Sequence, residues 1–350
     1  MTSPMHSIGL AMRIQWIFCV APLALASAAG SASAAEISPG GDLDIKLKGS
    51  LRSGFVFGGD EVLSGSDPGY GFSTDHRFEI LVSGKDDASQ TEYGGRFRLR
   101  LDNGRTNLVD RSYLYLRGSY GEVQFGNQKG VTDDDLPFVI GSFSIAAGTG
   151  GMDGDQPGQI VRYELAPSGQ ATKINYLTPT FGGLQAGLSF TPDTGANGLI
   201  SSIDDSDGDT KNMLEGGVRY DGTTGPLGFG VAVVATAGKN ETSGNDVNGI
   251  SAGFLLEYSD WGMAGSYGTG DEDGENLDYW NVGIGWKHGP LSLSTEYGAS
   301  SEGNVDPDIV IFSTTIKLMP GVSFRNDVEY ADPDTSGDYI AGLLQMRIDF

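Results

Sequence analysis

The chain has 350 residues, a formal net charge of −24 at pH 7 and only 38% hydrophobic residues. This acidity excludes a general nucleic-acid binder, because a strongly negative chain cannot neutralise a phosphate backbone. The single cysteine, Cys19, excludes a disulfide framework and a thiolate metal site.

The chain opens with the pattern of a secretory signal peptide. Arg13 precedes an apolar run, and the Ala-Ser-Ala sequence at 32–34 has the small residues of a cleavage site. We therefore predict that residues 1–35 are a signal peptide and that the mature chain starts near Ala35/Glu36. An N-terminal membrane anchor is the alternative, but the apolar run is short and dissolves into Ala, Gly and Ser.

Beyond this leader, apolar and polar residues alternate with a period of two. In the first segment Ile45 and Leu47 fall on one face, and Lys46 and Lys48 fall on the other. Because successive side chains of a strand point to opposite faces, this pattern predicts a strand with one apolar and one polar side. Sixteen such segments follow along the chain: 43–57, 74–84, 91–102, 110–118, 121–127, 171–178, 183–191, 212–221, 226–237, 248–258, 261–270, 276–288, 290–299, 307–319, 321–331 and 338–350.

The connections between these segments alternate in length. Connections such as 119–120 are short, whereas 58–73, 128–170 and 271–275 are longer, glycine-rich and acidic. An even strand count with this alternation is typical of outer-membrane barrels. A soluble β-sandwich or a secreted β-solenoid also has short alternating strands, but it has no reason to segregate loop lengths. We predict one all-β domain over residues 36–350, a transmembrane antiparallel β-barrel of about sixteen strands.

The last segment ends on an aromatic residue, Phe350, with Ile340, Leu344 and Ile348 on the same face. A terminal strand of this kind resembles the signal that the outer-membrane barrel-assembly machinery reads. We therefore expect Phe350 to engage that machinery and the first and last strands to pair.

Two stretches resemble the general porins of Gram-negative bacteria. Residues 110–128, DRSYLYLRGSYGEVQFGNQ, resemble the strand–turn–strand unit of that family, although the turn at 118–121 lacks its usual acidic residue. Residues 173–192, KINYLTPTFGGLQAGLSFTP, are similar to the family pattern Y-x-(S/T)-P-x-F-x-G. The resemblance implies a sixteen-stranded barrel in the outer membrane, usually a homotrimer, surrounded by lipid and lipopolysaccharide. It also implies a passive, water-filled pore for small hydrophilic solutes and ions, narrowed by residues 128–170 as the third loop.

Basic residues concentrate on the polar face of the first predicted strands. Since a charged side chain facing lipid costs about 2–4 kcal/mol at the bilayer midplane, we expect these residues to face the lumen. They form the predicted basic wall: Lys46, Lys48, Arg52, Arg77, Arg96, Arg98, Arg100 and Arg111. The long loop carries the predicted acidic counterpart: Asp133, Asp134, Asp135, Asp153 and Asp155.

A basic wall opposite an acidic loop would create a transverse field, because rings of charged side chains select ions by sign. The alternative is that the arginines only form salt bridges with Glu79, Asp102 and Asp110. The basic wall favours anions and the acidic loops favour cations, so the sequence does not decide between anion and cation selectivity.

Two further acidic clusters have the carboxylate density of a calcium site, since Ca²⁺ takes six to eight oxygen ligands. Neither has the glutamate spacing of an EF-hand, and the alternative is a solvated loop tip linked to lipopolysaccharide through divalent ions. No cofactor is otherwise required. The candidate calcium ligands are Asp205, Asp207, Asp209, Asp271 and Asp273.

We predict no enzymatic activity. His76 has Asp75 beside it and Ser73 nearby, but neighbours on a strand point to opposite faces, which spoils the geometry of a catalytic triad. Two other functions stay open. A substrate-specific channel would need an aromatic track along the lumen, and a non-porous adhesin or structural barrel would conduct no current.

Overall fold

A computed structural model describes residues 35–37, 43–58, 69–102, 108–133, 136–155, 157, 160–165, 167–195 and 209–350. Within these residues the chain is built from β-strands and two short 3-10 helices. None of the described helices is long and apolar enough to cross a membrane. Residues 1–34 lie outside the described residues, so the signal peptide stays a prediction.

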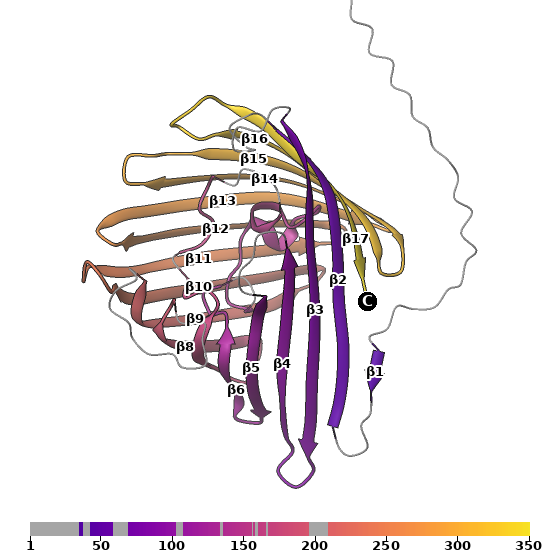
Figure 1. The fold of residues 1–350 in the computed structure, drawn as a ribbon, viewed down its shortest axis with the longest axis vertical. Coiled ribbons are helices and arrows are strands. Elements are labelled where there is room, and N and C mark those ends of the chain that lie inside the picture. Colours follow the sequence, from indigo (N-terminus) through magenta and orange to yellow (C-terminus); the bar gives the residue numbers. More distant parts are fainter. Residues whose placement is uncertain are drawn as a thin grey trace, which may run out of the picture. The chain divides into compact units, whose positions relative to one another are not determined.

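The strands run in an antiparallel meander around the barrel (Figure 1). The sixteen long strands are β2 (Leu43–Phe57), β3 (Tyr70–Asp86), β4 (Thr91–Asp102), β5 (Val109–Gly118), β6 (Gly121–Gln128), β7 (Ala171–Leu177), β8 (Leu184–Asp193), β9 (Thr210–Thr224), β10 (Leu227–Asn240), β11 (Asp246–Tyr258), β12 (Trp261–Glu272), β13 (Glu275–His288), β14 (Leu291–Glu302), β15 (Asp308–Met319), β16 (Val322–Asp332) and β17 (Tyr339–Asp349). The 3-10 helices η1 (Ser142–Ile145) and η2 (Gly151–Asp153) lie in the long connection between β6 and β7.

The barrel closes because β17 pairs with β2, with residues 342–349 opposite 57–50. Beyond the last strand, Gly49 donates its N–H to the Phe350 carbonyl at 2.9 Å, and Phe350 donates to Gly49 at 3.0 Å. The Phe350 ring also contacts Phe78 on β3, with the ring centroids 5.8 Å apart. The predicted pairing of the first and last strands is confirmed, and the chain forms a closed sixteen-strand antiparallel barrel.

The predicted strands agree with the structure apart from a few residues at their ends, but two details differ. The short strand β1 (Ala35–Ile37), which pairs with β2, was not predicted. The predicted long connection 271–275 is wrong, because β12 and β13 continue to a two-residue turn at Asp273 and Gly274. Both turn residues have positive φ, 60° and 93°, as a tight Asp-Gly hairpin turn requires.

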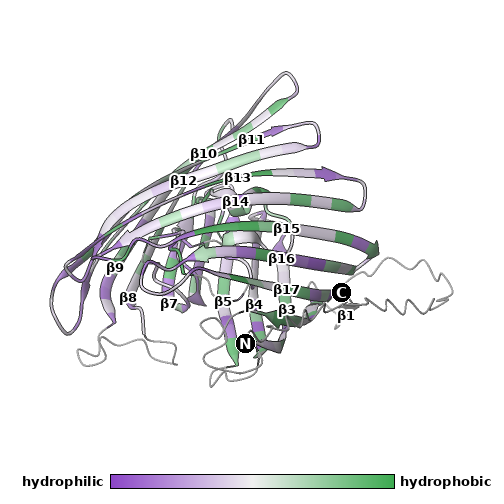
Figure 2. Cartoon of the chain, turned by 90° about the horizontal axis from the view of Figure 1, so that it is seen from above, coloured by the Kyte–Doolittle hydropathy of each residue, from purple (hydrophilic) through white to green (hydrophobic). Residues whose placement is uncertain are grey.

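The two faces of the strands differ in polarity. Large apolar side chains are exposed on alternating positions around the barrel, including Phe72 (83%), Leu114 (68%) and Leu188 (61%). The intervening positions carry most of the buried polar and charged side chains, and the alternation is visible along the strands in Figure 2. A water-soluble protein does not expose an apolar surface this extensive, whereas a membrane barrel presents such a surface to lipid.

Aromatic side chains mark two levels on the apolar face. Tyr258, Trp261 and Trp286 stand opposite one another on β11, β12 and β13, next to the short turns. Nearer the other end, Tyr267 is opposite Trp280, whose ring lies 4.9 Å from that of Tyr297. This is the arrangement of the aromatic girdles at the two membrane interfaces.

A charge placed on the apolar face should destabilise the barrel. We expect Val233→Arg, at an exposed apolar position in the middle of β10, to lower the free energy of unfolding in lipid vesicles by about 2–4 kcal/mol. Gly228→Arg on the same strand is the control, because it points to the inner face and an added Cβ meets no atom nearer than 3.7 Å. Equal destabilisation by both variants in denaturant titrations would contradict the assignment of the faces.

Candidate functional site

The strand register assembles the basic residues of β2 to β5 on the inner wall. Lys48 stands opposite Glu79, Glu79 opposite Arg98, and Arg98 opposite Arg111. In an antiparallel sheet such opposite residues share a face. One row therefore crosses four strands, and Arg77 and Arg100 form a second row beside it.

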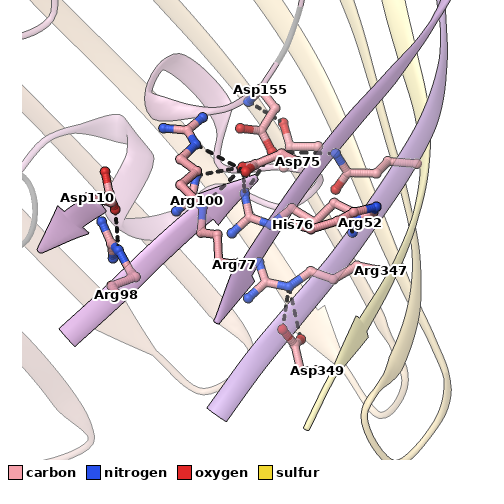
Figure 3. A network of polar contacts seen from close by, with 12 residues as sticks. Arg52, Asp75, His76, Arg77, Arg98, Arg100, Asp110, Asp155, Arg347 and Asp349 are labelled. Atoms are coloured by element: carbon pink, nitrogen blue, oxygen red, sulfur yellow. Dashed lines mark hydrogen bonds and ion pairs between the residues drawn. The ribbon is translucent and has the colours of Figure 1, made fainter. Parts of the chain in front are cut away.

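Asp75 on β3 is the centre of this wall (Figure 3). Its Oδ2 accepts hydrogen bonds from Arg77 at 2.8 Å and from Arg52 at 3.4 Å, and its Oδ1 accepts one from Arg100 at 3.1 Å. One carboxylate thus holds three guanidinium groups from three adjacent strands. Sequence reasoning missed Asp75 as a partner of the wall, although its spacing of two from Arg77 places both on one face.

The remaining wall arginines also have carboxylate partners. Arg96 pairs with Glu79 at 2.5 Å, and Arg98 pairs with both Asp110 and Glu79. Arg111, only 2% exposed, lies close enough to Asp110 to interact with its charge. The predicted salt bridges with Glu79 and Asp110 are therefore present, whereas the Asp102 side chain is outside the described part. Lys46 and Lys48 are exposed on the same face of β2.

Two arginines of the last strands join this wall. Arg347 on β17 stands directly opposite Arg52, and Arg325 on β16 lies one strand further, within range of both charges. Arg347 donates to Asp349 at 2.7 Å, and Arg325 donates to Ser323. Both arginines are more than 270 residues from Arg52 along the chain, so local alternation does not connect them with the basic wall. The predicted pairing of the first and last strands is the signal that brings them together.

The connection from β6 to β7 lies against the inner face of the strands. Wall side chains accept hydrogen bonds from its backbone N–H groups, which meets the need of a buried loop to pair its polar backbone. The donor and acceptor pairs are Val131 with Ser189, Ser142 with Asn281, Ala147 with Ser294, Thr149 with Asp327, Met152 with Glu296, Arg162 with Ser300 and Ser168 with Glu215.

Glycines on both partners allow this close approach. Phe138 packs where Gly187 and Gly217 leave room on β8 and β9, and a Cβ at Gly253 on β11 would collide with the Ile140 carbonyl. In the loop, Gly151 has φ 61° and lies against the Glu296 carboxylate, so a side chain is excluded by both conformation and space.

Glu215 on β9 connects the two ends of this loop. Its carboxylate accepts hydrogen bonds from the Thr132 hydroxyl at the start of the loop and from the Ser168 hydroxyl at its end. Lys173 on β7, 1% exposed, donates to Ser168 and to the Gly169 carbonyl. These contacts fix both ends of the loop to the barrel.

The predicted acidic loop residues have different surroundings. Asp155 accepts a hydrogen bond from Arg52 at 2.8 Å and one from Gln345 at 3.4 Å, so it joins the loop to the basic wall. Asp133 is buried at the start of the loop, where it pairs with Lys129. Asp153 accepts a hydrogen bond from the Tyr163 hydroxyl at 3.0 Å. Asp134 and Asp135 lie outside the described residues.

Arg162 anchors the returning part of the loop. It pairs with Glu302 on β14 at 3.2 Å and with Glu272 on β12 at 2.9 Å. Burial lowers the pKa of Arg162, but the hydrogen bond to Glu302 and the charges of Glu272 and Glu302 outweigh it and leave the pKa above its ordinary value. The guanidinium therefore stays charged, and paired with Glu272 and Glu302, across physiological pH.

The candidate calcium ligands are only partly described. Asp271 accepts a hydrogen bond from the Gly274 N–H, and Asp273 accepts hydrogen bonds from Ser243 and Asn245. These contacts order the hairpin loops. Among the described residues no three carboxylate, histidine or cysteine side chains are grouped to hold a metal ion. Asp205 and Asp207 are outside the described part, Asp209 is inside it, and the calcium site stays a prediction.

Comparison with known proteins decides the family. A sequence model described as Gram-negative porin matches residues 21–338. The chain belongs to this porin family. Among curated proteins, the porin is 23% identical to an uncharacterized protein of Rickettsia bellii over 86% of this chain and 88% of that protein. It is 22% identical to another, from Rickettsia felis, over 60% of this chain and 67% of that protein.

Solved porins have the same fold. An anion-selective porin from Comamonas acidovorans aligns with a TM-score of 0.64 at 16% identity, covering 88% of this porin and all of that chain. A mutant of the Rh. blastica porin aligns with a TM-score of 0.63 at 13% identity, covering 87% of this porin and all of that chain. At these identities the likeness concerns the fold.

Removing the shared carboxylate should destabilise the basic wall. We expect Asp75→Ala to lower the free energy of unfolding of the porin by about 1–3 kcal/mol, because three arginines lose their common partner. Asp87→Ala removes a carboxylate from an exposed turn and should change it by less than about 0.5 kcal/mol. Denaturant unfolding in detergent measures both, and equal effects would show that Asp75 does not organise the wall.

Proposed function

We propose that this porin forms a water-filled channel through the bacterial outer membrane, through which small hydrophilic solutes and ions diffuse passively. The observation that carries the proposal is the closed sixteen-strand barrel with a charged inner face and an apolar outer face. Barrels of this strand number leave an aqueous lumen. The family match supports the outer membrane as the location.

We further propose that the β6–β7 connection narrows the channel. Its contacts with the inner side of β8 to β16, and the contact of Asp155 with Arg52 on β2, support this. The narrowed zone would lie between the basic wall and the loop, where a solute meets a transverse field. We propose no catalytic role, and Asp75, which precedes His76 in the sequence, is engaged with arginines.

We also propose that the porin forms a homotrimer embedded in lipid and lipopolysaccharide. The outer-membrane barrel-assembly machinery would recognise the strand that ends on Phe350. An apolar hollow of about 960 Å³ on the wall formed by β3 to β6 supports a contact face for another copy. It is lined by Ile80, Phe97, Leu114 and Phe125, and Gly95 has no side chain to fill it.

The proposal predicts ionic current. Purified porin added to a planar lipid bilayer should produce stepwise conductance increases in potassium chloride, because an aqueous lumen conducts hydrated ions. Absence of conductance from correctly folded barrels, judged by their heat-dependent mobility on gels, would favour a non-porous adhesin or structural barrel.

Ion preference tests the basic wall. We expect Arg96→Ala, Arg98→Ala and Arg100→Ala combined to shift the reversal potential toward cation preference, because three positive charges leave the lumen. Arg117→Ala, at a short turn outside the wall, should leave it unchanged. Unaltered conductance and ion preference in the triple variant would refute the assignment of these arginines to the narrowest zone.

A further inference from the structure

A small hollow in the inner wall adjoins the Asp75 cluster and shares Arg52 and Arg77 with it. It has a volume of about 230 Å³ and lies among β2, β3, β4 and β17, between Asp75 and the end of the barrel where β17 finishes. Figure 3 shows Arg77, Arg98, Arg347 and Asp349 around this region. The basic residues that line it are Lys48, Arg52, Arg77, Arg98 and Arg347.

The hollow is strongly positive in a chain whose net charge is −24. Five basic side chains line it against two carboxylates, those of Glu79 and Asp349. Three of the five also pair with carboxylates beside the hollow: Arg52 with Asp75 and Asp155, Arg77 with Asp75, and Arg98 with Asp110. Arg96, Arg100 and Arg325 adjoin these groups, so among the described residues eight bases stand against five carboxylates, a local charge of 8 − 5 = +3. Asp349 pairs with Arg347, and Glu79 is shared between Arg96 and Arg98. Among the described residues no ion pair involves Lys48, so the positive excess is not cancelled within the hollow.

Two features of the hollow cost free energy. Arg347 and Arg52 face each other across adjacent strands, and like charges in that position destabilise a sheet. Nε of Arg52, a residue only 9% exposed, is buried and has no hydrogen-bond partner among the described residues. A buried unpaired donor costs free energy, and the facing charges of Arg52 and Arg347 are the cost that an anion in the hollow lowers.

We propose that the hollow binds small oxyanions carrying two or more negative charges, of the class of inorganic phosphate. Guanidinium groups match such oxyanions in geometry and charge. A volume of 230 Å³ equals that of about eight water molecules, enough for a phosphate with part of its hydration shell. This inference rests on the proposed channel function and deepens it, because it gives the channel a preferred class of solute.

The test is a titration with inorganic phosphate of the chloride current through single channels in planar bilayers. A bound oxyanion should reduce the current saturably, whereas nitrate at equal ionic strength should not. Lys48→Gln should weaken phosphate binding about tenfold at about 0.1 M salt, the screened effect in water of one positive charge about 4 Å from a divalent anion. Arg347→Gln should weaken it at least as much.

Lys46→Gln is the matched control, because Lys46 lies two residues away on the same exposed face of β2 and does not line the hollow. Less than a twofold change in this variant supports a local site. Equal weakening by Lys46→Gln and Lys48→Gln, or no saturable phosphate effect on conducting channels, overturns the proposed oxyanion binding in the hollow but not the channel function. Channels that never conduct overturn the proposed function instead.

Discussion

Hydrogen bonding of the backbone is the constraint on which the rest of this structure depends. In the hydrocarbon core of a membrane no water can satisfy an unpaired N–H or carbonyl, so a sheet that spans it must close on itself. Here the closure is the pairing of β17 with β2, completed by the two hydrogen bonds between Gly49 and Phe350. Once the sheet is closed, each strand has one face toward lipid and one toward the lumen, and the period of two in the sequence follows.

Closure also determines which charges become neighbours. Arg347 comes from the end of the chain and Arg52 from its beginning, yet they stand opposite each other. Such a concentration of positive charge is tolerated because Asp75, Asp155 and Asp349 are placed among the arginines and because the lumen is polar. The basic wall is therefore a consequence of topology as much as of local sequence.

The strands could be predicted because their signal is local: alternation within ten residues identifies both the strand and its inner face. The same alternation placed Arg96, Arg98 and Arg100 together. It could not assign the partner of each charge, since the register between strands decides whether Arg100 reaches Asp75 or Asp102. It also could not identify Glu215, Glu296 and Asp327, because their partners are backbone N–H or hydroxyl groups of a distant loop and not side chains of opposite charge.

The distribution of carboxylates bears on the conflict between an acidic chain and a basic wall. Glu215, Glu296 and Asp327 are each at most 1% exposed, and the loop covers them with its hydrogen bonds.

Glycines such as Gly187 and Gly253 weaken their strands, but they let the loop lie close enough to the wall to cover these carboxylates. Part of the negative charge of the chain is thus removed from the lumen, on the side of β8 to β16. In the proposed channel a solute meets the wall on the opposite side, which the loop contacts through Asp155 and Arg52. That wall is the positive one, from β2 to β5 with Arg325 and Arg347 beside it, so the net charge of −24 is a poor guide to the field inside.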